Sequence, residues 1–223
     1  ALSKWDIPIH EPPYQAAIHG LVRAIPEQVS LFIPQDISNS LNALSKWPIS
    51  IQETPYKEAI CHLTTIIPEK IAKFHAREIA NALNALSKWP ISIHEPPYQA
   101  AIQALVRTIP EQASLFIPQG INNSLNALSK WPISVHETPY QEAIHSLMAT
   151  ILKQVNTFSM RDIAGMLNAL SKWPISTHAS PYQETIQALV RAIPQQVKLF
   201  TAQNISNSLN ALAKWRLPIQ QKP

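Results

Sequence analysis

Apolar positions follow a helical spacing in two segments that alternate along the chain. In the first segment of one such pair, Tyr56, Ile60 and Ile67 fall at i, i+4 and i+11, on one face of a helix. We expect this helix to start at Pro55 with Thr54 as N-cap, because proline at the first helical position loses no useful donor and threonine can cap. Pro68 is expected to close or kink the helix, and residues 68–73 can add a short helical turn.

The second segment of each pair predicts a shorter amphipathic helix. Phe32 and Ile37 have the spacing of a hydrophobic staple around a helix start. Ile37, Leu41 and Leu44 then share one face. Small residues flank this face and allow close approach of the same helix from neighbouring repeats. The opposite face is polar and carries Gln35, Asn39, Asn42 and Lys46.

This pair of helices recurs with a period of 42 residues, which the tryptophans mark without exception: Trp5, Trp47, Trp89, Trp131, Trp173 and Trp215. Tyrosine and phenylalanine form two further columns with the same period, and all three columns are expected in the core. Such a period predicts an all-α fold, a right-handed α-solenoid of about five 42-residue helix-turn-helix repeats. We expect residues 1–223 to form a single solenoid, with repeats 5–46, 47–88, 89–130, 131–172 and 173–214, a partial repeat at each end, and more repeats in the parent protein.

Composition narrows the function classes. Only 14% of residues are charged against 46% hydrophobic, and the net charge is +4, a mild cationic bias that suits an anionic partner. Cys61 is the single cysteine, which excludes an internal disulfide and favours an intracellular setting, an organelle or the cytoplasm. No apolar run reaches the ~18 residues of a membrane span. No nucleophile–base set or glycine-rich phosphate loop is present, and the loop histidines lack the spacing of a metal site. We therefore expect neither an enzyme nor a cofactor.

Three positions of the second helix change identity between repeats, and alternate repeats resemble each other. The first variable column is Gln35, Arg77, Gln119, Arg161 and Gln203. The second variable column is Ser38, Ala80, Asn122, Ala164 and Ser206. The third variable column is Asn39, Asn81, Asn123, Gly165 and Asn207. A constant frame with variable side chains is expected of a surface that selects its ligand, so these residues, except Gly165, are candidates for reading bases. Duplication of a two-repeat cassette followed by drift would give the same pattern without a ligand.

One lysine stands before each tryptophan and forms the lysine column: Lys4, Lys46, Lys88, Lys130, Lys172 and Lys214. Evenly spaced cations suit a chain of phosphates. Lysine near the end of a helix also complements the helix dipole without any ligand, and both interpretations stay open. Asn42 and its equivalents are constant, so they cannot discriminate between bases and are expected to make structural hydrogen bonds.

The phrase Ile-x-Asn-x-Leu-Asn-Ala-Leu-Ser-Lys-Trp, together with Phe32-Ile33-Pro34-Gln35-Asp36-Ile37 before it, resembles the signature of octotricopeptide repeats and their RAP-associated relatives. The likeness covers mainly residues 32–47 and their equivalents. It implies paired-helix solenoids that bind RNA through variable helix positions. The unit of 42 residues is longer than the usual octotricopeptide repeat, and the Pro-Pro-Pro-Glu-Met phrase of that family is absent.

Two functions follow from these observations. The first is a helical-repeat module, monomeric, that binds single-stranded RNA along the second helices. The alternative is a scaffold of the armadillo or HEAT kind that binds a protein or an extended peptide in the same groove, which the low overall charge favours. A purely structural spacer is a third, weaker alternative.

Overall fold

The computed structural model describes residues 11–47, 53–134, 136–173 and 180–215. Over these residues all regular secondary structure is helical, as the sequence predicts. The chain divides into two compact units, residues 1–108 and 109–223, and the division falls within α5 (Tyr98–Gln112). The two units are treated separately below.

Each described repeat consists of a long helix, a 3₁₀ turn and an 11-residue or slightly longer helix. Unit 1 contains α1 (Pro12–Gln28), η2 (Val29–Leu31), α2 (Pro34–Leu44), α3 (Tyr56–Lys70), η3 (Ile71–Lys73), α4 (Ala76–Leu86) and most of α5. Unit 2 contains η4 (Ala113–Leu115), α6 (Pro118–Leu128), α7 (Tyr140–Gln154), η5 (Val155–Thr157), α8 (Met160–Leu170), α9 (Tyr182–Gln196), η6 (Val197–Leu199) and α10 (Ala202–Lys214).

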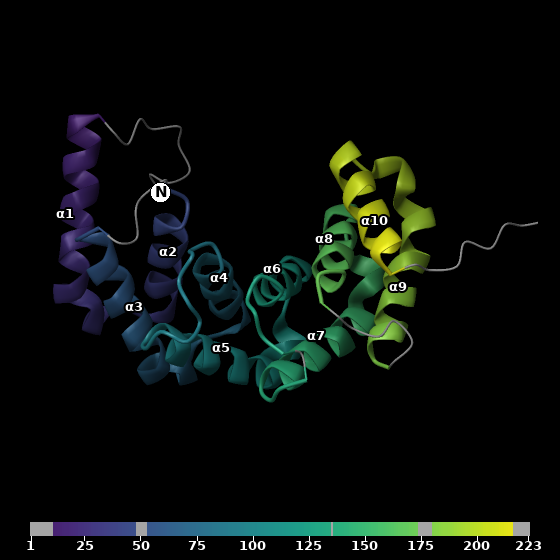
Figure 1. Cartoon of the computed structure of the whole chain (residues 1–223), viewed down its shortest axis with the longest axis horizontal. Coiled ribbons are helices and arrows are strands. Elements are labelled where there is room, and N and C mark those ends of the chain that lie inside the picture. The colour runs from purple at the N-terminus through teal and green to yellow at the C-terminus, as the bar shows by residue number, and fades with distance from the viewer. Residues whose placement is uncertain (1–10, 48–52, 135, 174–179, 216–223) are drawn as a thin grey trace, which may run out of the picture. The chain divides into compact units, whose positions relative to one another are not determined.

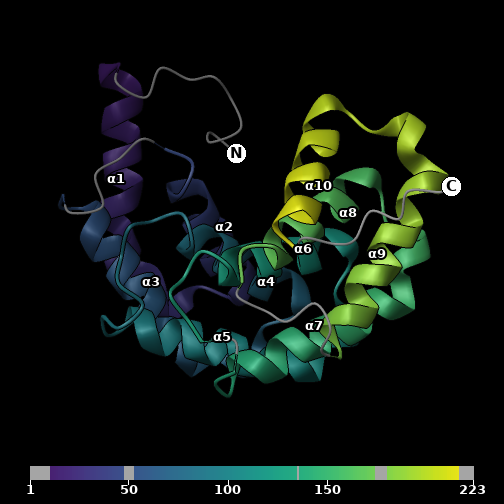
Figure 2. The ribbon, with the colours of Figure 1, turned by 45° about the vertical axis from the view of Figure 1, so that its right-hand side comes forward.

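Within each unit the long helices form one layer and the short helices another. In unit 1, α1 packs on α3 and α2 packs on α4. In unit 2, α7 packs on α9, while α8 lies between α6 and α10 (Figures 1 and 2). The short helices pack against each other more extensively than the long ones do. The polar face of each short helix therefore runs beside the same face of its neighbour within the unit.

The predicted apolar faces form the core. Ile37 and Leu41 are fully buried, and Leu83, Leu125 and Leu167 repeat this arrangement in the following helices. The aromatic columns are also internal: Phe74, Phe116, Phe158, Trp89, Trp131, Trp173, Tyr56, Tyr98, Tyr140 and Tyr182 are all buried. The prediction that these columns belong to the core is confirmed for these residues. Tyr14, in the first described helix, is exposed instead.

Polar contacts join the second repeat to the first and the fifth repeat to the fourth. Lys70 Nζ, at the end of α3, donates to the carbonyl oxygens of Ser30 and Phe32 at 2.6 and 2.7 Å. In unit 2, Gln196 Nε2 donates to the carbonyl oxygen of Phe158 at 3.0 Å. These bonds satisfy carbonyls that the turn between the two helices leaves without a helical partner.

The start of the long helix differs from the prediction. Except for α1, which begins at Pro12, the long helices begin at tyrosine, and the preceding proline is the N-cap in α3, α7 and α9. Thr54 is therefore not the N-cap. The Thr54–Pro55, Pro96–Pro97, Thr138–Pro139 and Ser180–Pro181 peptide bonds are cis.

Pro68 does not close the long helix. Helix α3 continues through it to Lys70, and the expected extra turn is the 3₁₀ turn η3. Helix α7 has Leu152 at the equivalent position, yet it has the same 15-residue length as α3. The proline therefore does not set where the helix ends.

The short helix begins where the spacing of the predicted hydrophobic staple places its start. Ile33 is the N-cap of α2, so Phe32 and Ile37 occupy the two staple positions. The acidic residue of this turn has a structural use: Asp36 Oδ2 accepts from the Ile33 backbone N–H at 3.1 Å. Asp162 Oδ2 accepts from the Ser159 N–H at 3.1 Å in the same way, while Ser159 Oγ accepts from the Asp162 N–H.

Candidate nucleic-acid interface

The first variable column lies at the second residue of each short helix and is exposed throughout. Gln35 on α2 and Arg77 on α4 are exposed in unit 1, and Gln119, Arg161 and Gln203 are exposed on α6, α8 and α10 of unit 2. Short helices are adjacent within each unit, so neighbouring members of this column lie on adjacent helices. The geometry leaves these side chains free to meet a ligand.

The second variable column lies mostly inside. Ser38, Ala80 and Ala164 are 1%, 2% and 1% exposed. Ser38 also donates its hydroxyl to the Gln35 carbonyl. These three side chains fill the contact between adjacent short helices, and a base could not reach them. We therefore remove them from the candidate surface, which corrects the expectation drawn from sequence. Asn122 is partly accessible, and Ser206 is exposed.

The third variable column is intermediate in solvent exposure between the first and the second. Asn39 is exposed, and Asn81, Asn123 and Asn207 are half-buried. Their amides stand at the border between the helix contacts and the surface. They can offer a donor and an acceptor to a ligand that the first variable column also touches.

In unit 2 members of all three columns meet at one polar cavity of about 500 Å³. It lies over the first halves of α8 and α10 and the adjoining part of α6, and is lined by Asn122, Arg161, Gly165, Thr201, Gln203, Asn204 and Asn207. Thr201 and Asn204 were not predicted as site residues. Thr201 Oγ1 caps α10 by accepting from the Asn204 N–H at 3.2 Å, and its position before a helix start was the only signal of this role.

The lysine column runs along the other end of the short helices. Lys46, Lys88, Lys130, Lys172 and Lys214 are all exposed, and Lys4 lies outside the described residues. Lys88 Nζ donates to Ser45 Oγ at 3.3 Å and Lys172 Nζ donates to Asn126 Oδ1 at 3.0 Å. Both lysines thus reach back to the preceding repeat. Asn126 makes the inter-repeat hydrogen bond expected of the constant asparagines.

Lysines of successive repeats in unit 2 are close enough to repel each other. The pKa of Lys172 is lowered, first by desolvation and then by the positive charges of Lys130 and Lys214. An anion beside Lys172 would relieve this repulsion, as a row of phosphates would.

Replacement of Lys214 by glutamine is expected to raise the pKa of Lys172, because one of its like-charged neighbours is removed. In wild type, the unfolded chain holds the Lys172 proton up to a higher pH than the folded chain. The free energy of unfolding therefore rises with pH between the lowered pKa and the ordinary value of 10.5. NMR titration of the lysine side chains measures the shift. Lys198→Gln, which removes an exposed lysine outside this row, is the control, and an unchanged Lys172 pKa in Lys214→Gln would contradict the assignment.

The three tryptophans that follow α4, α6 and α8 offer no stacking surface to a base. The exposed fractions of Trp89, Trp131 and Trp173 are 8%, 8% and 7%, so a base could not stack on them without unfolding the helix ends. Tyr98 donates its hydroxyl to the Leu86 carbonyl, which joins α5 to the end of α4. The variable and lysine columns can therefore offer a ligand amides, guanidinium groups and lysines.

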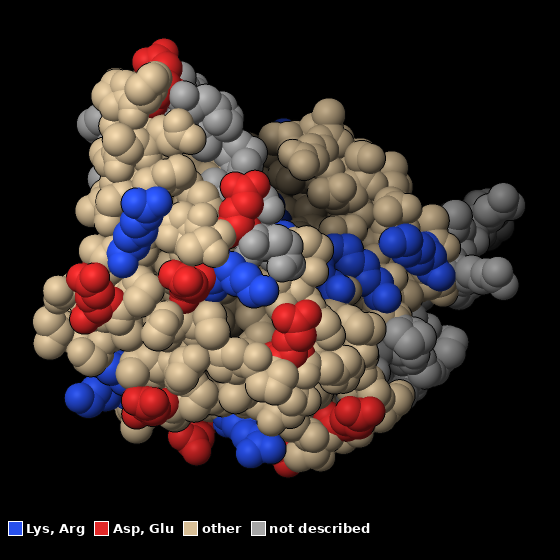
Figure 3. Space-filling view, turned by 60° about the vertical axis from the view of Figure 1, so that its left-hand side comes forward, with Lys and Arg blue, Asp and Glu red and all other residues tan. Residues whose placement is uncertain are grey.

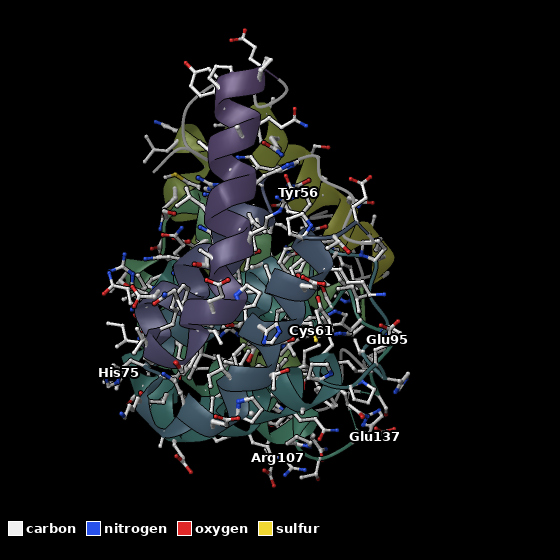
Figure 4. All side chains as sticks on the ribbon, turned by 90° about the vertical axis from the view of Figure 1, so that its left-hand side faces the viewer. Tyr56, Cys61, His75, Glu95, Arg107 and Glu137 are labelled. Atoms are coloured by element: carbon white, nitrogen blue, oxygen red, sulfur yellow. The ribbon has the colours of Figure 1, made fainter. Side chains whose placement is uncertain are left out.

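Other chemistry-bearing residues lie away from these columns. The exposed thiol of Cys61 on α3 lines a second cavity of about 300 Å³ in unit 1, together with Lys57, Glu95 and Tyr98 (Figure 4). On the face drawn in Figure 3, single acidic and basic side chains are scattered among uncharged residues, which make up most of that face. His94 and His136 are exposed in loops, while His10 and His178 lie outside the described residues.

Among the described residues, no three histidine, cysteine, aspartate or glutamate side chains gather as metal ligands. In the same part of the chain, none of the helices has the length and apolar character needed to cross a bilayer. No protein-family model matches the chain, and the search of curated proteins finds no significantly similar sequence.

Proposed function

We propose that this protein is a helical-repeat module that binds single-stranded RNA across the polar faces of its short helices. The observation that carries the proposal is the pairing of two features on the same helices. One end of each short helix presents an exposed variable residue, Gln or Arg, and an exposed lysine lies at the other end, either just after the helix or, in α10, as its last residue.

The two ends suit the two parts of a nucleotide. Gln203 and Lys214 are the ends of this surface on α10, and at 1.5 Å per residue they are roughly 16 Å apart along the helix axis. Long side chains shorten the gap from both sides. A ligand that touches both columns must extend across the helix, as a nucleotide does with its base on one side and its phosphate on the other. Lysine then supplies the salt-sensitive phosphate contact.

The lysine contacts described above support phosphate binding over helix capping. The short helices α2, α4, α6 and α8 end before their lysine, and Lys88 and Lys172 point back to the previous repeat. Each of these two cationic groups therefore has a hydrogen-bond partner outside its own helix. In unit 2 this arrangement brings like charges together, which has no benefit for folding.

The proposal also includes an arrangement of the repeats. We expect the repeats to continue as one right-handed α-solenoid, so that each second helix offers one step of the ligand surface. The alternation of Gln and Arg in the first variable column then predicts a preference that repeats every two nucleotides.

Selection from a random single-stranded RNA pool tests the proposal. We expect enrichment of bound RNA at low salt that falls steeply when salt is raised. Gln119→Arg should change the enriched sequences without unfolding the chain, because Gln119 is exposed. Absence of RNA enrichment at low salt would overturn the proposal, and specific enrichment from an extended-peptide library under the same conditions would favour the peptide-binding alternative.

A further inference from the structure

The cavity of unit 2 has the size of a ligand pocket, and its lining consists of polar side chains and one glycine. Its volume of about 500 Å³ falls within the range of about 300–1,000 Å³ that small-ligand sites occupy. Three adjacent short helices contribute to it, with Asn122 from α6, Arg161 and Gly165 from α8, and Gln203 and Asn207 from α10. No single repeat could form it.

Gly165 distinguishes the repeat that contains α8 from the other four repeats. The other four repeats have asparagine there, in Asn39, Asn81, Asn123 and Asn207. A Cβ atom on Gly165 would lie 2.5 Å from Asn122 Oδ1 and 2.6 Å from Asn122 Nδ2. The amide of Asn122 therefore occupies the space that a side chain at residue 165 would need. Asn122 itself is exceptional, because the other repeats have serine or alanine at its position.

The amide of Asn122 is incompletely satisfied by the described protein. Its Oδ1 is buried and has no hydrogen-bond partner. Buried amide oxygens in folded proteins nearly always have a donor, so water or a ligand is expected to supply one here. This unpartnered acceptor is the second, independent indication of a ligand at the cavity.

The lining favours a base over a phosphate. Asn122, Gln203, Asn204 and Asn207 are carboxamides, each with a donor and an acceptor, whereas a phosphate only accepts. Arg161 adds a planar fork of donors. Guanine is the base with two adjacent acceptors, O6 and N7, that match this fork. Its opposite edge carries N–H donors, which match the carboxamide oxygens.

We propose that this cavity binds one unpaired guanine, with Arg161 donating to O6 and N7 and the carboxamides of α6 and α10 reading the opposite edge. The inference rests on the proposed RNA-binding function and names the base that one site selects. It also gives Gly165 a role, since asparagine at this position would displace Asn122 and narrow the cavity.

The test compares fluorescein-labelled uridine decamers with and without one central guanosine, using anisotropy titration of the whole chain. We expect the guanosine to tighten binding by about tenfold, the scale of one good bidentate contact. 7-Deazaguanosine, which lacks the N7 acceptor, and inosine, which lacks the amino group, should each lose much of the gain. Arg161→Gln, which restores the residue of the odd repeats, should abolish the preference.

Arg191→Gln is the matched control, because it removes the same charge from the exposed face of α9 and should keep the preference. Gly165→Asn should lose the preference as well, with circular dichroism melting used to separate this effect from loss of fold. Uridine decamer binding in which guanosine changes the affinity less than twofold would overturn the guanine site and leave RNA binding intact. No binding to any of these RNAs, nor to the random pool, would overturn both proposals.

Discussion

Trp131→Ala is expected to lower the free energy of unfolding by about 3–5 kcal/mol, the largest effect on stability that we predict. Trp131 follows the end of α6 and is 8% exposed, so the substitution removes a large buried ring and leaves a cavity. Urea denaturation followed by circular dichroism measures the loss. Hydrogen exchange should show that the loss of protection is concentrated in unit 2, because contacts in a repeat protein are mostly between neighbours.

Trp215→Ala is the matched control from the same column. Trp215 is half-buried, so it should lose clearly less stability than Trp131. Equal losses of stability at the two positions would contradict the expectation that each tryptophan stabilises the fold in proportion to its burial. A strong effect of Trp131→Leu on RNA affinity in a chain that stays folded would point instead to stacking by the indole ring.

Replacement of Lys172 and Lys214 together by glutamine is expected to cause the largest loss of RNA affinity. Each lysine that neutralises a phosphate contributes about 0.7 to the slope of log Kobs against log salt for a single strand. The double variant should therefore reduce the magnitude of the slope by about 1.4 and weaken binding at low salt. Filter binding of a uridine-rich RNA at several salt concentrations measures both quantities.

The control for this variant is Lys153→Gln with Lys198→Gln, which removes two exposed lysines from α7 and η6 of the same unit. Both double variants have the same net charge. If they weaken RNA binding equally, the effect comes from overall charge and the lysine column has no special role.

The repeat period and the apolar spacing were sufficient to predict the short helices and much of the core. Phe32 and Ile37 lie at the two staple positions that their spacing indicates, and Ile37 and Leu41 are fully buried. Patterns of this kind succeed because burial of one helix face depends on local periodicity. All-helical structure over the described residues follows from the same signal.

The starts of the long helices were harder to predict, because proline can serve either as the first helical residue or as the cap. Pro55 is the cap of α3, whereas Pro12 is inside α1. Pro68 is similarly ambiguous. Its ring leaves the Thr64 carbonyl without the usual backbone donor, yet α3 continues to Lys70.

How deeply the side chains of the variable columns are buried depends on contacts between repeats. Ser38 was predicted as a base reader, but it is 1% exposed on α2, which packs on α4, so its burial excludes that role. The unit 2 cavity requires three helices and the close approach of Asn122 to Gly165. Sequence can show that both residues depart from their columns. It does not show that Asn122 and Gly165 lie against each other.

The salt dependence of single-stranded RNA binding by the wild-type chain tests the central claim most directly. With Lys130, Lys172 and Lys214 on successive phosphates, log Kobs should fall with log salt with a slope of about −2, and more steeply if Lys46 and Lys88 also take part. A slope near zero, or binding too weak to measure at low salt, would contradict the claim that these short helices form an RNA-binding surface.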